Sequence, residues 1–129
     1  MPVKALLVDD SPTVRKAIRY QLMVYGCRDF SEAENATQAL EMLRQERYNL
    51  VTLDLMMPDV GGLTSEQVFE KIRREFPRIA ILIVSSIPHE KVRSEYVEGG
   101  ALAYIVKPFS RFSFEPARHK LRRLFEEFQ

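Results

Sequence analysis

Residues 50–57 read Leu-Val-Thr-Leu-Asp-Leu-Met-Met, a nearly continuous apolar run that carries one carboxylate, Asp54, near its end. The run at 50–55 is short for a helix, and continuous apolarity is what a strand buried on both faces needs. Four more short apolar runs follow this pattern, at residues 5–8, 27–33, 79–84 and 101–106. Together they predict five strands of a parallel sheet covered by helices, with the weakest run, 27–33, at an edge.

Segments with helical spacing of apolar residues separate these runs. Cap residues precede three of them: Ser11 before Pro12, Asn35 with Gln38, and Thr64 with Gln67, the last two spaced as capping boxes. Helices are predicted at residues 12–25, 36–46, 65–76 and 89–98, and a fifth carries Ala117, Leu121, Leu124, Phe125 and Phe128 on one face. The predicted order is therefore strand then helix, five times over.

This alternation predicts an α/β fold of the doubly wound (βα)5 flavodoxin-like type. Such a fold is a three-layer sandwich with a five-stranded parallel sheet in the order 2-1-3-4-5 and right-handed crossovers. We expect residues 1–129 to form a single domain, because their number and their 46% apolar content suit one hydrophobic core. Ligands of such sheets bind beyond the carboxyl ends of the strands, where the strand order reverses between strands one and three.

The composition argues against several classes of function. Lys and Arg number 19 against 18 for Asp and Glu, so no global charge favours nucleic acid or a membrane surface. The basic residues after Pro116 are followed by Glu126 and Glu127, which favours a solvated helix face over nucleic-acid binding. We find no signal peptide, membrane span or glycine-rich nucleotide loop, and Cys27 is the only cysteine. A cytoplasmic protein without a membrane segment is expected.

Polar side chains follow the four strong strands at the point where each one ends. They are Asp9-Asp10, Asp54, Ser85-Ser86 and Lys107-Pro108. Each alone has an ordinary explanation, since aspartates cap helices, serines stabilise turns and lysines are solvated. In the predicted topology, however, all four ends share one edge of the sheet. Three carboxylates gathered there repel one another unless a cation is present, and hard oxygen ligands select Mg²⁺, for which Mn²⁺ can substitute.

Four motifs, in this order, resemble those of bacterial response-regulator receiver domains, the chemotaxis-regulator-like switches of two-component signalling. They are Val8-Asp9-Asp10-Ser11, Asp54-Leu-Met-Met-Pro58 with Gly62, Ser85-Ser86, and Tyr104-Ile-Val-Lys107-Pro108-Phe109. The similarity spans nearly the whole chain.

The resemblance implies that Asp54 is the phosphoacceptor, phosphorylated by a histidine kinase, a histidine phosphotransfer protein or a small acyl phosphate. It implies that Asp10, Asp54 and the backbone carbonyl of Met56 ligate Mg²⁺ directly, while Asp9 acts mainly through water. Lys107 would hold a phosphoryl oxygen. A cis peptide is expected between Lys107 and Pro108.

The same resemblance implies a switch. The Ser85 hydroxyl would move to the phosphoryl group and vacate space into which Tyr104 turns. The face formed by the fourth helix, the fifth strand and the fifth helix would then bind a downstream protein or a second copy of the chain. Such a module promotes its own phosphoryl transfer and slow autodephosphorylation, but it is not a conventional enzyme.

Two features depart from the family pattern. Ser85 stands where many receivers have threonine, and Pro116 indicates that the last helix begins about three residues late, so its output face can differ. We expect no output domain on this chain, so output would pass through partners.

Two other functions stay open. One is a receiver-like binding module that works without phosphorylation. The other is a Mg²⁺-dependent aspartyl-phosphate phosphohydrolase, although Met56 occupies the position where such enzymes usually carry a second acid.

Overall fold

The computed structural model describes residues 3–57, 62–110 and 112–127, and it confirms the predicted α/β class. Its strands are β1 (Lys4–Val8), β2 (Asp29–Ala33), β3 (Leu50–Leu53), β4 (Ala80–Ser85) and β5 (Ala103–Val106). All of them pair in parallel, in the order β2-β1-β3-β4-β5. The helices are α1 (Pro12–Val24), α2 (Ala36–Gln45), α3 (Ser65–Glu75), α4 (Glu90–Glu98) and α5 (Arg118–Glu127), with a 3₁₀ turn, η1 (Glu115–Ala117), before α5.

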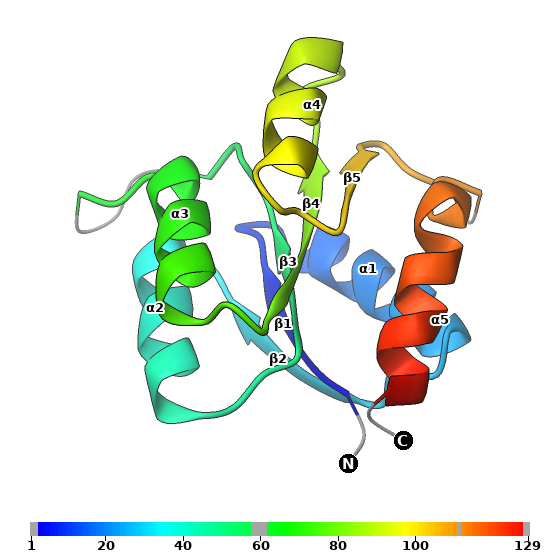
Figure 1. The fold of residues 1–129 in the computed structure, drawn as a ribbon, viewed down its shortest axis with the longest axis horizontal. Helices are drawn as coiled ribbons and strands as arrows, with labels where there is room; N and C mark the ends of the chain where they lie inside the picture. The colour runs from blue at the N-terminus through cyan, green and yellow to red at the C-terminus, as the bar shows by residue number, and fades with distance from the viewer. Residues whose placement is uncertain (1–2, 58–61, 111, 128–129) are drawn as a thin grey trace.

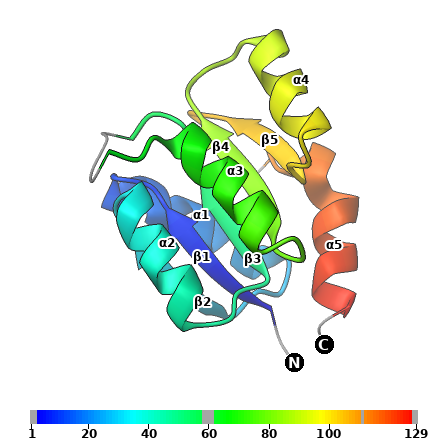
Figure 2. The ribbon, with the colours of Figure 1, turned by 60° about the vertical axis from the view of Figure 1, so that its left-hand side comes forward.

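Helices cover both faces of the sheet (Figures 1 and 2). Alternate strand residues point to opposite faces: Leu6, Val51 and Ile81 pack with α2 and α3, whereas Leu7, Leu50 and Leu82 pack with α1 and α5. Because both faces are covered, the central strands need apolar side chains at nearly every position. This requirement explains the unbroken apolar runs in the sequence.

The edge strand β2 differs from the central strands, as the sequence predicted. It pairs only with β1, and of its residues Ala33 alone is buried. An edge strand has one partner and less cover, so polar residues such as Asp29 and Glu32 are tolerated there. This explains why the second apolar run is weak.

Helix caps follow the sequence signals with one correction. Ser11 caps α1 by accepting from Val14 N, and Thr64 and Gln67 form a reciprocal capping box on α3. The capping box predicted for α2 forms only in part. The Asn35 side chain accepts from Gln38 N, but Gln38 Oε1 accepts from Glu34 N rather than from Asn35 N.

Several element boundaries also differ from the prediction. β3 ends at Leu53, so Asp54 lies just beyond the strand instead of inside it, and β5 begins at Ala103. Pro116 lies in η1, and α5 begins only at Arg118. The predicted face residues Ala117, Leu121, Leu124 and Phe125 are buried, while Phe128 lies outside the described residues, as does Pro58 of the second motif.

Helix α4 is held in an unusual way, because it has no buried residue of its own. The ring of Tyr96 packs edge-on against Phe69 of α3, with 4.9 Å between ring centroids. Arg73 of α3 donates from Nε to the carbonyl of Gly99, which caps the end of α4, at 2.8 Å. The next residue, Gly100, has a φ of +109°, which favours glycine.

Gly100→Ala is expected to destabilise the fold more than Gly26→Ala. Both glycines have φ near +105°, but a Cβ at Gly26 meets nothing within 4 Å, whereas one at Gly100 would lie 2.1 Å from Arg73 Cζ. Strain costs about 1–3 kcal/mol at either position, and displacing Arg73 from the Gly99 carbonyl adds roughly 1 kcal/mol at Gly100. Urea unfolding of both variants measures the difference. Equal losses would contradict a structural role for the Arg73 contact.

Candidate functional site

The carboxyl ends of β1 and β3 bring three aspartates together. Asp9 and Asp10 follow β1, and Asp54 follows the neighbouring β3. Each offers a carboxylate oxygen, and these oxygens all lie within 4.8 Å of one another. Asp9 and Asp54 are 0% and 1% exposed, whereas Asp10 faces solvent. The cluster therefore has two buried members and one member open to water.

The buried carboxylates are held by backbone N–H groups and by one lysine. Asp9 Oδ1 accepts from Ser11 N at 2.9 Å, and Asp54 Oδ1 accepts from Met56 N at 3.0 Å. Lys107, which follows β5, places its Nζ 2.9 Å from Asp9 Oδ2 and 3.3 Å from Asp54 Oδ2. A single ammonium group thus bridges two buried carboxylates.

The charges in the site do not balance. Burial raises the pKa of Asp9, and the hydrogen bonds from Ser11 and Lys107 offset only part of this effect. Burial also acts to lower the pKa of Lys107, but its contacts with Asp9 and Asp54 outweigh burial and raise that pKa. Lys107 therefore stays protonated near neutral pH, while the cluster as a whole has too little positive charge.

The predicted switch residues meet at one loop residue. Ser85 ends β4 and is fully buried, and its Oγ accepts from Ile87 N at 3.2 Å. The hydroxyl of Tyr104 on β5 donates to the carbonyl of Ile87 at 2.7 Å. Tyr104 is only 4% exposed, so its ring is already packed inside in this structure. Ile87 therefore joins the two side chains.

The remaining predicted residues lie close by. The amide of Lys107 donates to the carbonyl of Ser85 at 2.7 Å, and the Lys107–Pro108 peptide is cis. Met56 lies in the bend after Asp54 and is 58% exposed. The carboxylates, the lysine and Ser85 thus all follow or end strands at one edge of the sheet.

One charged residue near the cluster was not predicted. Arg15 on α1 is buried, and its Nη1 donates to the carbonyl of Asp9 at 2.5 Å while its Nε lies 2.9 Å from Glu32 Oε1. A sequence signal for it exists, since Arg15 falls on the apolar stripe of α1 with Ile18 and Leu22. A cation on such a stripe needs buried partners.

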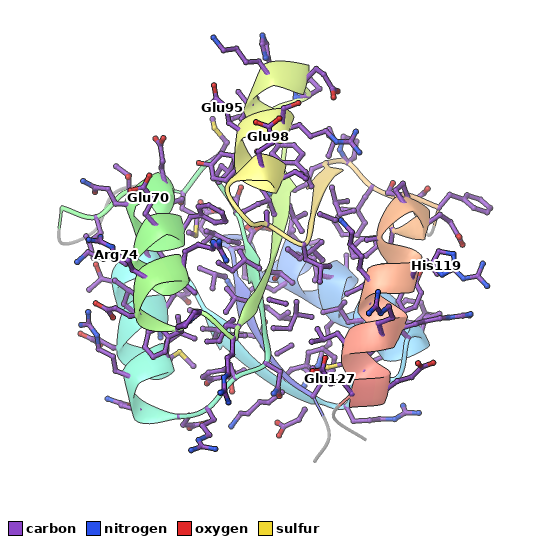
Figure 3. The ribbon with its side chains drawn as sticks, in the orientation of Figure 1. Glu70, Arg74, Glu95, Glu98, His119 and Glu127 are labelled. Atoms are coloured by element: carbon purple, nitrogen blue, oxygen red, sulfur yellow. The ribbon has the colours of Figure 1, made fainter. Side chains whose placement is uncertain are left out.

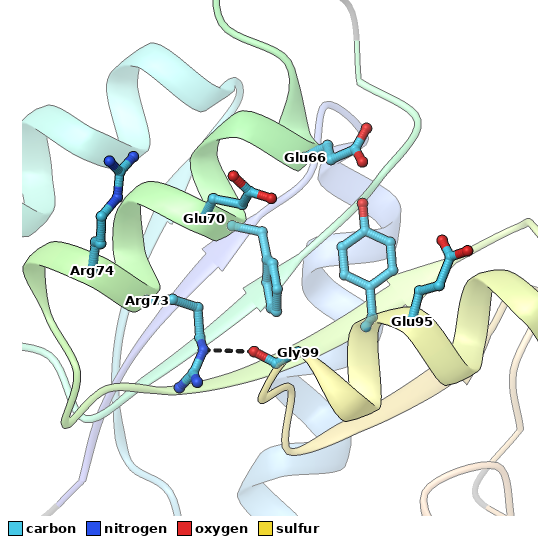
Figure 4. Close-up of a pocket in the computed structure, with 8 residues that line it drawn as sticks. Glu66, Glu70, Arg73, Arg74, Glu95 and Gly99 are labelled. Atoms are coloured by element: carbon cyan, nitrogen blue, oxygen red, sulfur yellow. Dashed lines mark hydrogen bonds between the residues drawn. The ribbon is translucent and has the colours of Figure 1, made fainter.

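A groove on the described surface lies apart from the three aspartates. It has a volume of about 620 Å³ and runs between α3 and α4 (Figure 4). Its rim is charged on both helices, with Glu70 and Arg74 on α3 and Glu95 on α4 (Figures 3 and 4). None of the three aspartates lines this groove, so it is separate from the candidate site at the strand ends.

Comparison with known proteins identifies the family. A match to the family described as "Response regulator receiver domain" spans residues 5–115. The chain belongs to the response-regulator receiver family. The chemotaxis protein CheY of Bacillus subtilis is 31% identical over 109 residues, which cover 84% of this chain and 88% of CheY. The sensory transduction protein LytR of Staphylococcus epidermidis is 33% identical over 120 residues, but the match covers only 46% of LytR.

Solved receiver structures share the fold. The response regulator TrrA of Thermotoga maritima, determined in complex with Mg²⁺ and a beryllium fluoride, has a TM-score of 0.74 and 29% identity, and the match covers 95% of this chain and 98% of TrrA. The isolated receiver domain of RcsB from Salmonella enterica has a TM-score of 0.83 at 19% identity, over 95% of this chain and 90% of that domain. The receiver fold is therefore retained at low sequence identity.

Family membership explains the acidic cluster. Receiver domains are signalling modules that switch on phosphorylation and bind Mg²⁺ at an acidic pocket. The residues here fit that ion, because three carboxylates supply hard oxygen ligands and the one ammonium group that contacts them, that of Lys107, leaves negative charge unbalanced. No helix in the described part of the chain is long and apolar enough to cross a membrane.

Asp9→Asn is expected to stabilise the metal-free protein at about pH 7. Because the folded pKa of Asp9 is raised above its unfolded value of 3.8, its stabilising contribution is full below that value and is lost as the pH rises through the folded pKa. The neutral asparagine avoids this loss, so its advantage should shrink toward about pH 4. Urea unfolding in EDTA at both pH values measures this difference.

Excess Mg²⁺ should reverse the order of stability, because it binds only the folded state and binds the unaltered chain better. Asp29→Asn, at an exposed position on β2, is the matched control and should show neither effect. A metal-free Asp9→Asn protein that is less stable than the unaltered chain at both pH values would contradict the charge argument.

Proposed function

We propose that this chain is a two-component signalling switch that accepts a phosphoryl group on Asp54. The observation that carries the proposal is a buried carboxylate, Asp54, within 3.3 Å of Lys107 Nζ and beside two further carboxylates. A carboxylate oxygen of Asp54 would attack phosphorus while the bond from phosphorus to the donor breaks. The donor leaves as the imidazole of a histidine or as a small carboxylate, and the product is an aspartyl phosphate.

In this proposal Asp10, Asp54 and the backbone carbonyl of Met56 hold Mg²⁺ directly, and Asp9 acts mainly through water. Mn²⁺ can take the same place. The ion supplies positive charge to the incoming phosphoryl oxygens. Asp10 suits direct ligation because its carboxylate is open to solvent, whereas both oxygens of Asp9 already accept hydrogen bonds.

Lys107 would contact the phosphoryl group after giving up one of its carboxylate partners. Its Nζ already lies between Asp9 and Asp54, so it needs only a short side-chain movement to reach a phosphoryl oxygen on Asp54. When the ion and the phosphoryl group occupy the site, the ammonium group exchanges a carboxylate partner for a phosphoryl oxygen. The buried positive charge therefore keeps an anionic partner throughout.

The switch would act through Ile87. The Ser85 hydroxyl can donate to a phosphoryl oxygen, and Ser85 Oγ is also the acceptor for Ile87 N. Tyr104 holds the carbonyl of the same residue. Phosphorylation would then favour the state in which Ser85, Ile87 and the buried Tyr104 ring are held together, and it would bias the α4–β5–α5 face. A downstream protein, or a second copy of the chain, would read that face.

The phosphoryl donor is proposed to be a histidine kinase or a histidine phosphotransfer protein in the cytoplasm. A mainly apolar pocket of about 330 Å³ adjoins the site, and it is lined by Thr13, Val14, Ala17, Ser86, Lys107, Pro108 and Phe109. An apolar patch beside the phosphoacceptor can serve as a docking surface for a protein donor. In this proposal residues 1–129 act as one receiver domain that is not a conventional enzyme.

Phosphorylation at Asp54 can be tested with acetyl phosphate and with beryllofluoride. We expect intact-mass analysis to detect one added phosphoryl group in Mg²⁺ and none in EDTA. Beryllofluoride should bind with the same metal dependence. Asp54→Asn should abolish both, whereas Asp29→Asn should retain both. Phosphorylation of the Asp54→Asn chain at the same rate would refute the assignment. Turnover of phosphate monoesters would favour the phosphohydrolase instead.

Tyr104→Phe tests the switch separately from the chemistry. The change removes only the hydroxyl that donates to Ile87, so beryllofluoride affinity should change by less than about threefold, corresponding to under 1 kcal/mol. Hydrogen exchange in residues 86–89 should become faster, and beryllofluoride should protect them less than in the unaltered chain. Equal protection in both proteins would remove Tyr104 from the switch.

A further inference from the structure

Asp10 differs from the other two carboxylates in how it is held. The Asp9 and Asp54 side chains each accept a backbone N–H and contact Lys107. Among the described residues, none forms a hydrogen bond or ion pair with the Asp10 side chain. Its direction therefore depends on the backbone to which it is attached.

Arg15 forms a hydrogen bond with that backbone. Its Nη1 donates to the carbonyl of Asp9 at 2.5 Å. This carbonyl belongs to the peptide that joins Asp9 to Asp10, so fixing its direction fixes the plane from which Asp10 projects. The amide of Asp9, on the other side, is held by the carbonyl of Ala33 at 3.1 Å.

Glu32 holds the guanidinium in place. Its Oε1 lies 2.9 Å from Arg15 Nε, and it projects from the edge strand β2 next to β1. The Arg15 side chain is 9% exposed and that of Glu32 is 42% exposed. A rigid planar fork with two fixed partners orients a carbonyl better than a single flexible ammonium group would.

We propose that Arg15, oriented by Glu32, is a positioning residue that directs Asp10 toward the divalent cation. The inference rests on the proposed function, because it assumes that Asp10 ligates Mg²⁺. Arg15 itself contacts neither the ion nor the phosphoryl group. It acts only through the peptide between Asp9 and Asp10.

The direction in which Mg²⁺ affinity changes when Arg15 is replaced distinguishes a positioning role from an effect of its charge. A guanidinium close to a cation site repels the cation, so charge alone predicts tighter Mg²⁺ binding when Arg15 is removed. Positioning predicts weaker binding, because Asp10 loses its orientation. Loss of a group that orients a ligand typically costs about 10-fold to 100-fold in metal affinity.

The experiment is calorimetric titration of the full chain with Mg²⁺, with folding of each variant checked by thermal unfolding in EDTA. Arg15→Gln should weaken Mg²⁺ binding by about 10-fold. Glu32→Gln, which keeps Arg15, should weaken binding by a smaller factor. Arg19→Gln is the matched control, because Arg19 lies on the same helix, faces solvent and packs over the ring of Phe30. It should leave the affinity unchanged.

The Mg²⁺ affinity of a double variant distinguishes loss of positioning from general damage to the fold. In the Asp10→Asn background, Arg15→Gln should cause no further loss of Mg²⁺ affinity, because the side chain it positions no longer ligates. Unchanged or tighter binding by Arg15→Gln, or an undiminished loss in the Asp10→Asn background, would overturn the proposal. If Arg15→Gln does not fold, Arg15→Lys and Glu32→Gln give the same comparison.

The outcomes for Arg15 and for the proposed function can be distinguished. An unaltered chain that binds Mg²⁺ but takes up neither beryllofluoride nor a phosphoryl group overturns the function alone. An unaltered chain that does both, with Arg15→Gln equal to it in Mg²⁺ affinity, overturns the positioning role alone. An unaltered chain that binds no Mg²⁺ overturns both.

Discussion

Lys107 Nζ lies 2.9 Å from Asp9 Oδ2 and 3.3 Å from Asp54 Oδ2, so one ammonium group serves two carboxylates that are almost excluded from solvent. Burying either charge without a partner would be costly, and one lysine does not neutralise two acids. Burial raises the pKa of Asp9, and the hydrogen bonds from Ser11 and Lys107 offset only part of this effect. The site thus keeps in its metal-free form an electrostatic demand that a divalent cation can meet.

The sheet allows the fold to tolerate these clustered carboxylates. Parallel strands end at one edge, and each end presents backbone N–H groups to the side chains that follow, as Ser11 and Met56 do for Asp9 and Asp54. The apolar strand residues on both faces supply the stability that the acidic edge lacks. The carboxylates that repel one another lie only at the carboxyl ends of the strands, outside the apolar core.

Much of this could be predicted from the sequence, because the signals were local. The apolar runs located the strands, Ser11 and Thr64 located helix starts, and the polar residues after the strands located the acidic edge. What failed depends on a choice between possible hydrogen-bond partners that only the folded chain decides. Gln38 bonded to Glu34 instead of completing a capping box, and Arg15 found Asp9 and Glu32 across elements. No local pattern reveals that the Tyr104 ring is buried. Its hydroxyl donates to the carbonyl of Ile87, which lies in the loop after β4.

Helix α4 has no buried residue. It is attached by the partly buried Val92 and Tyr96, which pack against the core, and by the hydrogen bond from Arg73 to the Gly99 carbonyl. An element without a fully buried side chain is expected to open locally at a lower free energy than the whole domain. A protein that captures α4 therefore displaces little native packing. Amino-acid replacements on its outer face can accumulate without loss of the fold, so this helix is where related chains can diverge in the partners they recognise.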